Sequence, residues 1–248
     1  MKPLFFRYGS KRNIVDTLIK MIPSHKIYVE AFFGGGALYW NKEPSEKEII
    51  NDLDESMVHP FKLLKKINIK KAVDDFPNRT VKDYENYLDK PDDSNETIFN
   101  KNLLEGRIYF MSNMKSKLIR INYNNGLPSG FINILPLLKD YKKRIKNTTI
   151  LNKDYIKVIL DYDSPETFFY LDPPYSDSAS VYKHSYIDYE QMAELLKNIK
   201  GDFLLSINDD PLIRKIFKGF FYKKIFVKSI SHQKNADRTE LLIYNYEI

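Results

Sequence analysis

Three consecutive glycines interrupt the first third of the chain and strongly limit the folds that it can adopt. They follow residues 27–33 (IYVEAFF), a β-branched and aromatic run typical of a buried strand, and we expect a helix to begin near Ala37. A second short apolar segment, residues 48–53 (EIINDL), ends in acid at Asp52 and Asp54. A strand, a tight turn, a helix and a second strand in this order predict a β-α-β unit and therefore a parallel sheet.

The same alternation returns in the last hundred residues. Residues 167–171 (TFFYL) and 202–207 are predicted strands, and a helix is expected to begin at Asp188. Residues 225–230 and 240–246 alternate as two further strands and predict an antiparallel terminal hairpin. The sequence therefore favours an α/β fold with a Rossmann-like, mostly parallel sheet and a C-terminal antiparallel hairpin.

Between these two regular parts the sequence changes character. Residues 61–145 are rich in Lys and Asn and show little strand-like alternation. Helical patterns are present near residues 56–71 and 97–111. We predict one discontinuous domain made of residues 1–60 and 146–248, interrupted by a mainly helical insertion.

The glycine-rich turn and the acid after the next strand match the way in which doubly wound sheets bind an adenosine. Glycines let a ligand approach the backbone, and Asp52, about 20 residues further on, could accept hydrogen bonds from ribose hydroxyls. A dinucleotide site would need a third glycine where this chain has Tyr39. An adenosine cofactor without a pyrophosphate, such as S-adenosyl-L-methionine, fits better, although glycine runs also form turns that bind nothing.

The segment Asp172-Pro173-Pro174-Tyr175 directly follows the predicted strand at residues 167–171. It should lie at the carboxyl edge of the sheet, where open α/β folds bind ligands. The two prolines aim their carbonyls rigidly, Asp172 adds an anionic acceptor, and Tyr175 offers a flat face for stacking. Such a cluster suits a planar base with an amino group and requires no metal ion or covalent nucleophile; a strand-terminal turn without function is the alternative.

Composition indicates a soluble, basic protein. The net charge of +6 and basic clusters at residues 62–71, 115–120 and 139–146 suit a polyanionic partner, although Lys-rich helices also form solvated faces. The absence of cysteine and the scattered positions of the four histidines argue against a metal site. No apolar run approaches about 18 residues, and the start does not resemble a secretory signal, so we expect a cytoplasmic protein without a membrane partner.

These motifs together resemble the Dam-type DNA adenine-N6 methyltransferases. The residues that carry the resemblance are Tyr8-Gly9-Ser10-Lys11, Glu30-Ala31-Phe32-Phe33-Gly34-Gly35-Gly36, Asn51-Asp52-Leu53-Asp54, Asp172-Pro173-Pro174-Tyr175 and Thr239-Glu240-Leu241-Leu242-Ile243. The resemblance spans most of the chain and is weakest between about residues 70 and 150. It implies a Rossmann-like methyltransferase fold, with residues 1–60 and 146–248 forming the catalytic domain and residues 61–145 recognising the target.

The resemblance also implies roles for single residues. The implied cofactor-binding residues are Tyr8, Lys11, Phe33, Gly34, Gly35, Gly36, Asp52 and Asp172. In the implied catalytic segment, Asp172 contacts the target amine, Pro173 offers it a carbonyl, Pro174 completes the turn, and Tyr175 stacks on a flipped-out base. Candidate DNA contacts are Arg120, Asn122, Asn124 and Asn125, because Arg recognises guanine and Asn recognises adenine in the major groove; these residues are also typical of surface turns.

We therefore predict a site-specific enzyme that transfers the methyl group of S-adenosyl-L-methionine in line to N6 of an adenine flipped out of double-stranded DNA. A partner restriction endonuclease is compatible with this prediction and not required by it. Methylation of cytosine N4 or of RNA adenine on the same fold is an open alternative, and so is a catalytically inert DNA-binding protein. Asp172, where cytosine enzymes more often carry Ser, favours adenine.

Overall fold

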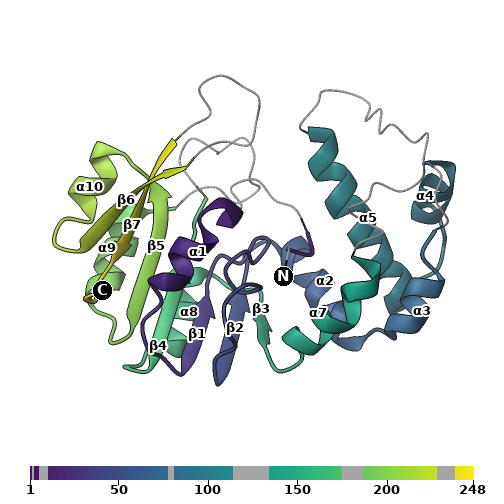
Figure 1. Cartoon of the computed structure of the whole chain (residues 1–248), viewed down its shortest axis with the longest axis horizontal. Coiled ribbons are helices and arrows are strands. Elements are labelled where there is room, and N and C mark those ends of the chain that lie inside the picture. The colour runs from purple at the N-terminus through teal and green to yellow at the C-terminus, as the bar shows by residue number, and fades with distance from the viewer. Residues whose placement is uncertain (2, 6–10, 78–80, 114–133, 175–186, 228–237) are drawn as a thin grey trace. The chain divides into compact units, whose positions relative to one another are not determined.

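The chain folds into two compact units (Figure 1). The computed structural model describes residues 1, 3–5, 11–77, 81–113, 134–174, 187–227 and 238–248. The first unit comprises Met1, Lys11–Val58 and Thr148–Ile248, and the second comprises Lys2–Ser10 and His59–Asn147. The first unit is thus built from two long stretches of sequence and the single residue Met1.

A seven-stranded mixed sheet forms the centre of the first unit, with strand order β3-β2-β1-β4-β5-β7-β6 (Figure 1). The strands are β1 (Ile27–Glu30), β2 (Lys47–Asn51), β3 (Thr149–Leu151), β4 (Thr167–Leu171), β5 (Asp202–Asn208), β6 (Phe221–Val227) and β7 (Arg238–Tyr244). Strands β1 to β5 are parallel, whereas β7 runs antiparallel to both β5 and β6. The predicted Rossmann-like sheet with an antiparallel C-terminal hairpin is confirmed.

The central strands are buried along their length, which explains their continuous apolar sequences. All five residues of β4 are buried, and so are the five inner residues of β5. A parallel strand that is covered on both faces needs apolar side chains at every position rather than at alternate ones. The main core of the unit includes Val29, Phe169 and Leu205.

Three helices of the first unit, α8, α9 and α10, begin at side chains that cap them. The unit contains α1 (Val15–Lys20), α8 (Tyr155–Tyr162), α9 (Tyr189–Lys197) and α10 (Pro211–Ile216). Asp154, Asp188 and Asp210 each accept a hydrogen bond from a backbone N–H in the first turn of the helix that follows. The predicted helix start at Asp188 is confirmed, with the Gln191 N–H donating to the Asp188 carboxylate at 2.9 Å.

The helix expected to begin near Ala37 is not formed, and that prediction was wrong. Residues 34–42 make a series of turns, in which Trp40 N donates to Gly36 O at 3.0 Å. Pro44 follows closely and disfavours helical geometry at the residue before it, so the segment has room for little more than one turn. Tyr39 and Trp40 are buried instead, with their rings edge to face at 4.9 Å.

The second unit is helical throughout the part that the structure describes. Its elements are most of α2 (Glu55–Lys66), α3 (Ile69–Asp74), α4 (Val81–Leu88), α5 (Asn95–Asn113), the 3-10 turn Leu135–Leu137 and α7 (Leu138–Ile145). The predicted helical patterns near residues 56–71 and 97–111 correspond to α2, α3 and α5. Phe61, Phe99 and Leu103 are among its fully buried side chains.

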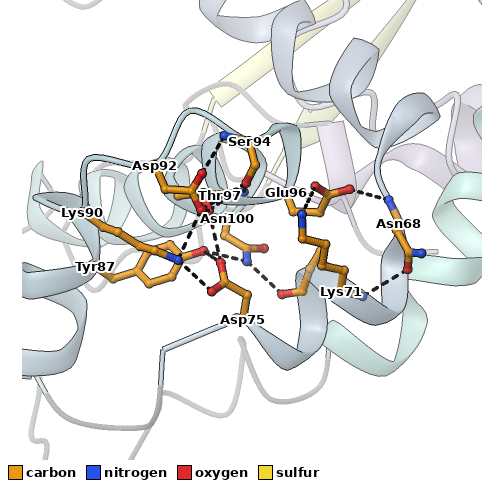
Figure 2. Close-up of polar contacts among 11 residues, drawn as sticks. Asn68, Lys71, Asp75, Tyr87, Lys90, Asp92, Ser94, Glu96, Thr97 and Asn100 are labelled. Carbon is orange, nitrogen blue, oxygen red and sulfur yellow. Dashed lines mark hydrogen bonds and ion pairs between the residues drawn. The ribbon is translucent and has the colours of Figure 1, made fainter.

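A polar network centred on Asp75 joins α3, α4 and α5 (Figure 2). The Asp75 carboxylate accepts hydrogen bonds from Tyr87 at 2.5 Å, Lys90 at 2.8 Å and Thr97 at 3.2 Å. The Asn100 amide donates to Tyr87 Oη at 3.0 Å and extends the network along α5. Because these donors come from different segments, Asp75 fixes how the helices of this unit pack.

Candidate active site

The predicted site residues of the first unit follow three adjacent parallel strands. Glu30 at the end of β1 is aligned with Ile50 of β2 and with Tyr170 of β4. The glycine-rich turn, Asp52 and Asp172 come after β1, β2 and β4 respectively. Their backbones therefore leave the sheet at the same carboxyl edge, as expected for ligand sites of open α/β folds.

The glycine-rich turn is bonded directly to Asp52. The Gly34 N–H donates to Asp52 Oδ2 at 2.8 Å, and the Asp54 N–H donates to Asp52 Oδ1 at 3.0 Å. These two bonds fix the orientation of the carboxylate. Gly34 has a φ of 48°, and an added Cβ would meet no heavy atom within 4 Å. Open space beside an oriented carboxylate suits a ligand that carries hydroxyl groups, so these residues fit the adenosine part of the predicted cofactor.

Gly36 closes the same turn against an aromatic side chain. Its φ is 66°, and a Cβ at this position would lie 2.4 Å from two atoms of the Phe33 ring. Phe33 is buried, and its ring meets Tyr39 edge to face at 5.6 Å. The close approach of the Gly36 backbone to this ring requires glycine at position 36.

Asp172 is held by a lysine from the far end of the sequence. Lys11, in the short 3-10 helix Lys11–Asn13, is 3% exposed, and its Nζ donates to Asp172 Oδ1 at 2.6 Å. Asp172 itself is 22% exposed. Lys11 Nζ also lies 3.9 Å from Glu240 Oε2, and Glu240 is fully buried on β7. The ammonium group of Lys11 thus lies between two carboxylates.

The proline segment after Asp172 is anchored from α9. Tyr189 Oη donates to the carbonyl oxygen of Pro174 at 2.8 Å, and the Tyr189 ring packs against the main core. The Pro173 side chain is buried. Because Pro174 restricts the ψ of the residue before it, the Pro173 carbonyl is limited to extended orientations, and the bond from Tyr189 holds the carbonyl of Pro174.

A third carboxyl group, Glu30, is buried near the same edge. Tyr28 Oη donates to Glu30 Oε2 at 2.7 Å. Burial raises the pKa of Glu30 to about 8; the bond from Tyr28 opposes this shift, and the negative charge of Asp172 adds to it. Glu30 is therefore mostly protonated at neutral pH.

The structure brings some predicted site residues together and does not describe others. It joins Lys11 to Asp172 and Gly34 to Asp52 by direct hydrogen bonds. Phe33, Gly35, Gly36, Pro173 and Pro174 lie in the same unit. The remaining predicted site residues fall outside the described residues: Tyr8, Tyr175, Arg120, Asn122, Asn124 and Asn125.

The sequence analysis names Glu240 within a segment that carries the resemblance but gives it no role in the site, and it does not name Tyr189. Glu240 had a visible signal, because it is a charged residue directly before the apolar run Leu241–Ile243. Tyr189 had none, since a tyrosine at the start of a helix is common. In the described parts of the chain, no group of three or more acidic or histidine side chains is arranged to hold a metal ion. Nor does any helix described there have the length and apolar character of a membrane span.

Known proteins resemble this chain over nearly its whole length. A curated relative, the type II methyltransferase M.CviBI of Paramecium bursaria Chlorella virus NC1A, is 24% identical over 270 residues, which cover 99% of this chain and 100% of the relative. Among solved structures, yhhF of Escherichia coli has a TM-score of 0.44 at 9% identity, covering 100% of this chain and 91% of that one. SMU.1697c of Streptococcus mutans, solved in complex with SAH, has a TM-score of 0.39 at 10% identity, covering 96% and 99%.

The family match is the decisive one. The family of D12 class N6 adenine-specific DNA methyltransferases matches residues 8–232, which include the glycine-rich turn, Asp52 and the Asp172 segment. The predicted resemblance is thereby confirmed. The chain belongs to the D12 class N6 adenine-specific DNA methyltransferase family and is a DNA adenine-N6 methyltransferase.

Proposed function

We propose that the enzyme transfers the methyl group of S-adenosyl-L-methionine directly to N6 of an adenine flipped out of double-stranded DNA. The observation that supports this proposal most is the Lys11–Asp172 bond of 2.6 Å at the sheet edge that also carries the Gly34–Asp52 bond. An oriented anionic acceptor for the amine thus follows β4, and an oriented acceptor for ribose hydroxyls follows β2, on the two sides of β1. No covalent enzyme intermediate is needed.

The cofactor would be held mainly by the turn after β1. S-adenosyl-L-methionine, when bound, supplies an electrophilic methyl group on a sulfonium centre. We assign Asp52 to the ribose hydroxyls, because its carboxylate is already oriented by Gly34 and Asp54. The open space beside Gly34 supports an approach of the adenosine to the backbone there. Tyr8, Lys11, Phe33, Gly35 and Gly36 complete the proposed cofactor site.

The N–H groups of the target amine would donate hydrogen bonds to the Asp172 carboxylate and to the Pro173 carbonyl. The lone pair of an adenine N6 amine is delocalised into the ring, which makes it a poor nucleophile. Acceptors on one side of the amine favour a more tetrahedral nitrogen and direct its lone pair toward the electrophile. The bond from Tyr189 to Pro174 supports this assignment, because it fixes the carbonyl next to that of Pro173.

The DNA would be recognised largely by the second unit. We assign target recognition to residues 61–145, with Arg120, Asn122, Asn124 and Asn125 as candidate contacts and Tyr175 of the catalytic segment stacking on the flipped base. The net charge of +6 supports binding of a polyanion. The type II name of the viral relative supports a partner restriction endonuclease that cuts the same sequence when it is unmethylated.

Methyl transfer from labelled cofactor, followed by nucleoside analysis of the DNA, tests this function. We expect wild-type enzyme to form N6-methyladenine, and Asp172→Asn to lower the transfer rate by about 100-fold or more, because an amide is a weaker acceptor than a carboxylate. Asp161→Asn is the matched control, since it removes another Lys-paired aspartate of the same unit, 3.1 Å from Lys153 and 41% exposed. This control should transfer at the wild-type rate.

Three outcomes would overturn parts of the proposal. Absence of label in any DNA at saturating cofactor would reject S-adenosyl-L-methionine as the methyl donor. Label found as N4-methylcytosine, or only in RNA, would reject adenine in DNA as the substrate. Wild-type rates in Asp172→Asn would reject the role of this carboxylate.

A further inference from the structure

Glu240 is a fully buried carboxylate that is linked to the proposed catalytic residue Asp172 through Lys11. It lies on β7, aligned with Asn208 of β5 on one side and Ile225 of β6 on the other. Its Oε2 accepts a hydrogen bond from Ser206 Oγ at 3.1 Å and lies 3.9 Å from Lys11 Nζ. Ser206 is fully buried as well. The C-terminal hairpin thus places a fully buried carboxylate next to Lys11.

The energetic cost of burying this charge indicates that it is matched by Lys11. A carboxylate or ammonium group loses its hydration when it is buried, and only a well-placed partner compensates this loss. Coulomb attraction falls as the inverse of distance, so the Glu240–Lys11 attraction is about two thirds of the Asp172–Lys11 attraction at equal screening. Glu240 therefore contributes substantially to the electrostatic stabilisation of the Lys11 ammonium group.

We propose that Glu240 is a positioning residue for methyl transfer. It holds the Lys11 ammonium from the buried side of the site, so that Lys11 donates to Asp172 Oδ1 in one fixed direction. Because Lys11 also faces Glu240, it offsets the negative potential at Asp172 less completely than it would in an exclusive ion pair. A carboxylate whose negative potential is less offset is a stronger acceptor for the N–H groups of the target amine. This inference rests on the proposed role of Asp172.

A purely structural role predicts different behaviour. The Ser206–Glu240 bond links β5 to β7, and Glu240 could serve only to fix these strands. In that case Glu240→Gln would reduce stability without slowing the folded enzyme. A positioning role requires instead that the substitution act on the rate, and that it act through Lys11.

The first test is the steady-state kinetics of Glu240→Gln, which keeps the shape of the side chain and an oxygen for Ser206. We expect kcat to fall about 10- to 100-fold, as for a slight misplacement of a catalytic group, while KM for DNA and for the cofactor stays within about twofold. The matched control is Glu48→Gln. It removes a buried carboxylate that is paired with a buried lysine, Lys42, at 2.7 Å. Glu48 lies near the start of β2, whereas Asp52 follows the end of that strand. This control variant should lose stability but keep the wild-type kcat.

A double-mutant cycle with Lys11→Met tests whether Glu240 acts through Lys11. Lys11→Met leaves the buried Glu240 and the partly exposed Asp172 without their ammonium, so adding Glu240→Gln should raise the unfolding temperature of Lys11→Met, although the same change lowers that of the wild type. In the Lys11→Met background, Glu240→Gln should have no further effect on kcat. Equal effects of Glu240→Gln on kcat and on the unfolding temperature in the wild-type and Lys11→Met backgrounds would overturn the proposal. An unchanged kcat in the single variant Glu240→Gln would overturn it as well.

The cycle also separates this inference from the proposed function. Unfolding is measured without DNA or cofactor, so it reports on the Lys11–Glu240 pair even if the wild-type enzyme methylates no adenine. If Lys11→Met does not fold, the kcat values of Glu240→Gln and Glu48→Gln still test the proposal. A lower kcat in Glu240→Gln alone supports the proposal, and equal kcat values in the two variants reject it.

Discussion

Two glycines of the turn after β1 share a left-handed backbone but differ in their surroundings. Gly34 and Gly36 have φ values of 48° and 66°. A Cβ at Gly36 would lie 2.4 Å from the Phe33 ring, whereas a Cβ at Gly34 would meet nothing within 4 Å. The two positions therefore allow the cost of the backbone conformation to be separated from the cost of the contact.

We predict that Gly36→Ala destabilises the enzyme more than Gly34→Ala does. Each substitution places an alanine in the left-handed region, at about 1–2 kcal/mol. Gly36→Ala must in addition displace the buried Phe33 ring, which overpacked sites resist by about 1–3 kcal/mol. Chemical denaturation measures the difference.

The loss of cofactor affinity, corrected for the folded fraction, should follow the opposite order and be larger in Gly34→Ala than in Gly36→Ala. Gly34→Ala places a methyl group in the space that we assign to the adenosine, so calorimetry should show weaker binding of S-adenosyl-L-methionine with only a modest loss of stability. Equal stability losses in the two variants would show that the Phe33 contact carries no cost. Unchanged cofactor affinity in Gly34→Ala would place the adenosine elsewhere.

The positions of single residues in the fold were predictable from the sequence where the residue directly follows a strand. Asp52 and Asp172 were predicted from the short apolar runs that precede them, and both do follow strands of the sheet. The partners of these residues were not predictable in the same way. Lys11 and Asp172 are 161 positions apart, and only the folded sheet shows that they are bonded. The place of Glu240 in the site was not predicted, because its burial depends on β7 lying between β5 and β6.

At the scale of elements, predictions succeeded where local sequence decides the structure. Strand β4 was predicted with its observed bounds, because an apolar run ends sharply at Asp172. The α9 start was predicted because Asp188 caps its own helix. The helix near Ala37 was predicted wrongly, since the pattern of the β-α-β unit outweighed the nearby Pro44 and the burial of Tyr39 and Trp40. Strand order within the sheet is a property of long-range packing and was not available from these patterns.

The network around Asp75 leads to a prediction for the helical unit (Figure 2). Burial opposes the ionisation of Asp75, but the hydrogen bonds from Lys90 and Tyr87 outweigh it and hold the pKa of this carboxyl below its usual range. A lowered folded-state pKa contributes stability above the unfolded-state pKa, and this contribution is lost as pH falls through the folded-state value. The loss is therefore expected below about pH 4.

We predict that Asp75→Asn lowers the unfolding temperature at pH 5 and shows a smaller further decrease between pH 4 and pH 2 than the wild type. Asp74→Asn is the control, because the neighbouring Asp74 is 60% exposed in its pair with Lys70 and exposed pairs contribute little. Thermal unfolding followed by circular dichroism measures both variants. Parallel pH profiles of Asp75→Asn and the wild type would contradict the prediction.

At the scale of the whole molecule, a basic protein carries an acidic site. The net charge of +6 suits DNA, yet the first unit gathers Glu30, Asp172 and Glu240 within or directly after its strands. Lys11 neutralises only part of this negative charge. Protonation of Glu30, whose pKa is raised to about 8, removes another part at neutral pH. Overall stability should therefore depend on pH in a range where exposed carboxylates no longer titrate.

The sign of that dependence follows from Glu30. Its folded-state pKa of about 8 lies above the unfolded value of about 4.3, so between these values the folded protein binds more protons than the unfolded chain. The contribution of the protonated carboxyl to stability is complete below about pH 4 and declines as pH rises toward 8. Above about pH 8 both states are ionised, and the dependence levels off.

Glu30→Gln should remove this decline, because glutamine keeps an uncharged polar group of similar shape beside Tyr28 at every pH. We predict that the unfolding temperature of the variant, relative to the wild type, rises steadily between pH 5 and pH 8, by an amount equivalent to a few kcal/mol, by rough estimate. Glu194→Gln, whose side chain is 69% exposed beside Lys197, should follow the wild-type profile. A constant difference between Glu30→Gln and the wild type over this range would mean that Glu30 ionises in the folded enzyme as it does in the unfolded chain. The sheet edge would then hold two uncompensated carboxylates near Lys11 at neutral pH, and the charge balance that we assign to Asp172 would have to be revised.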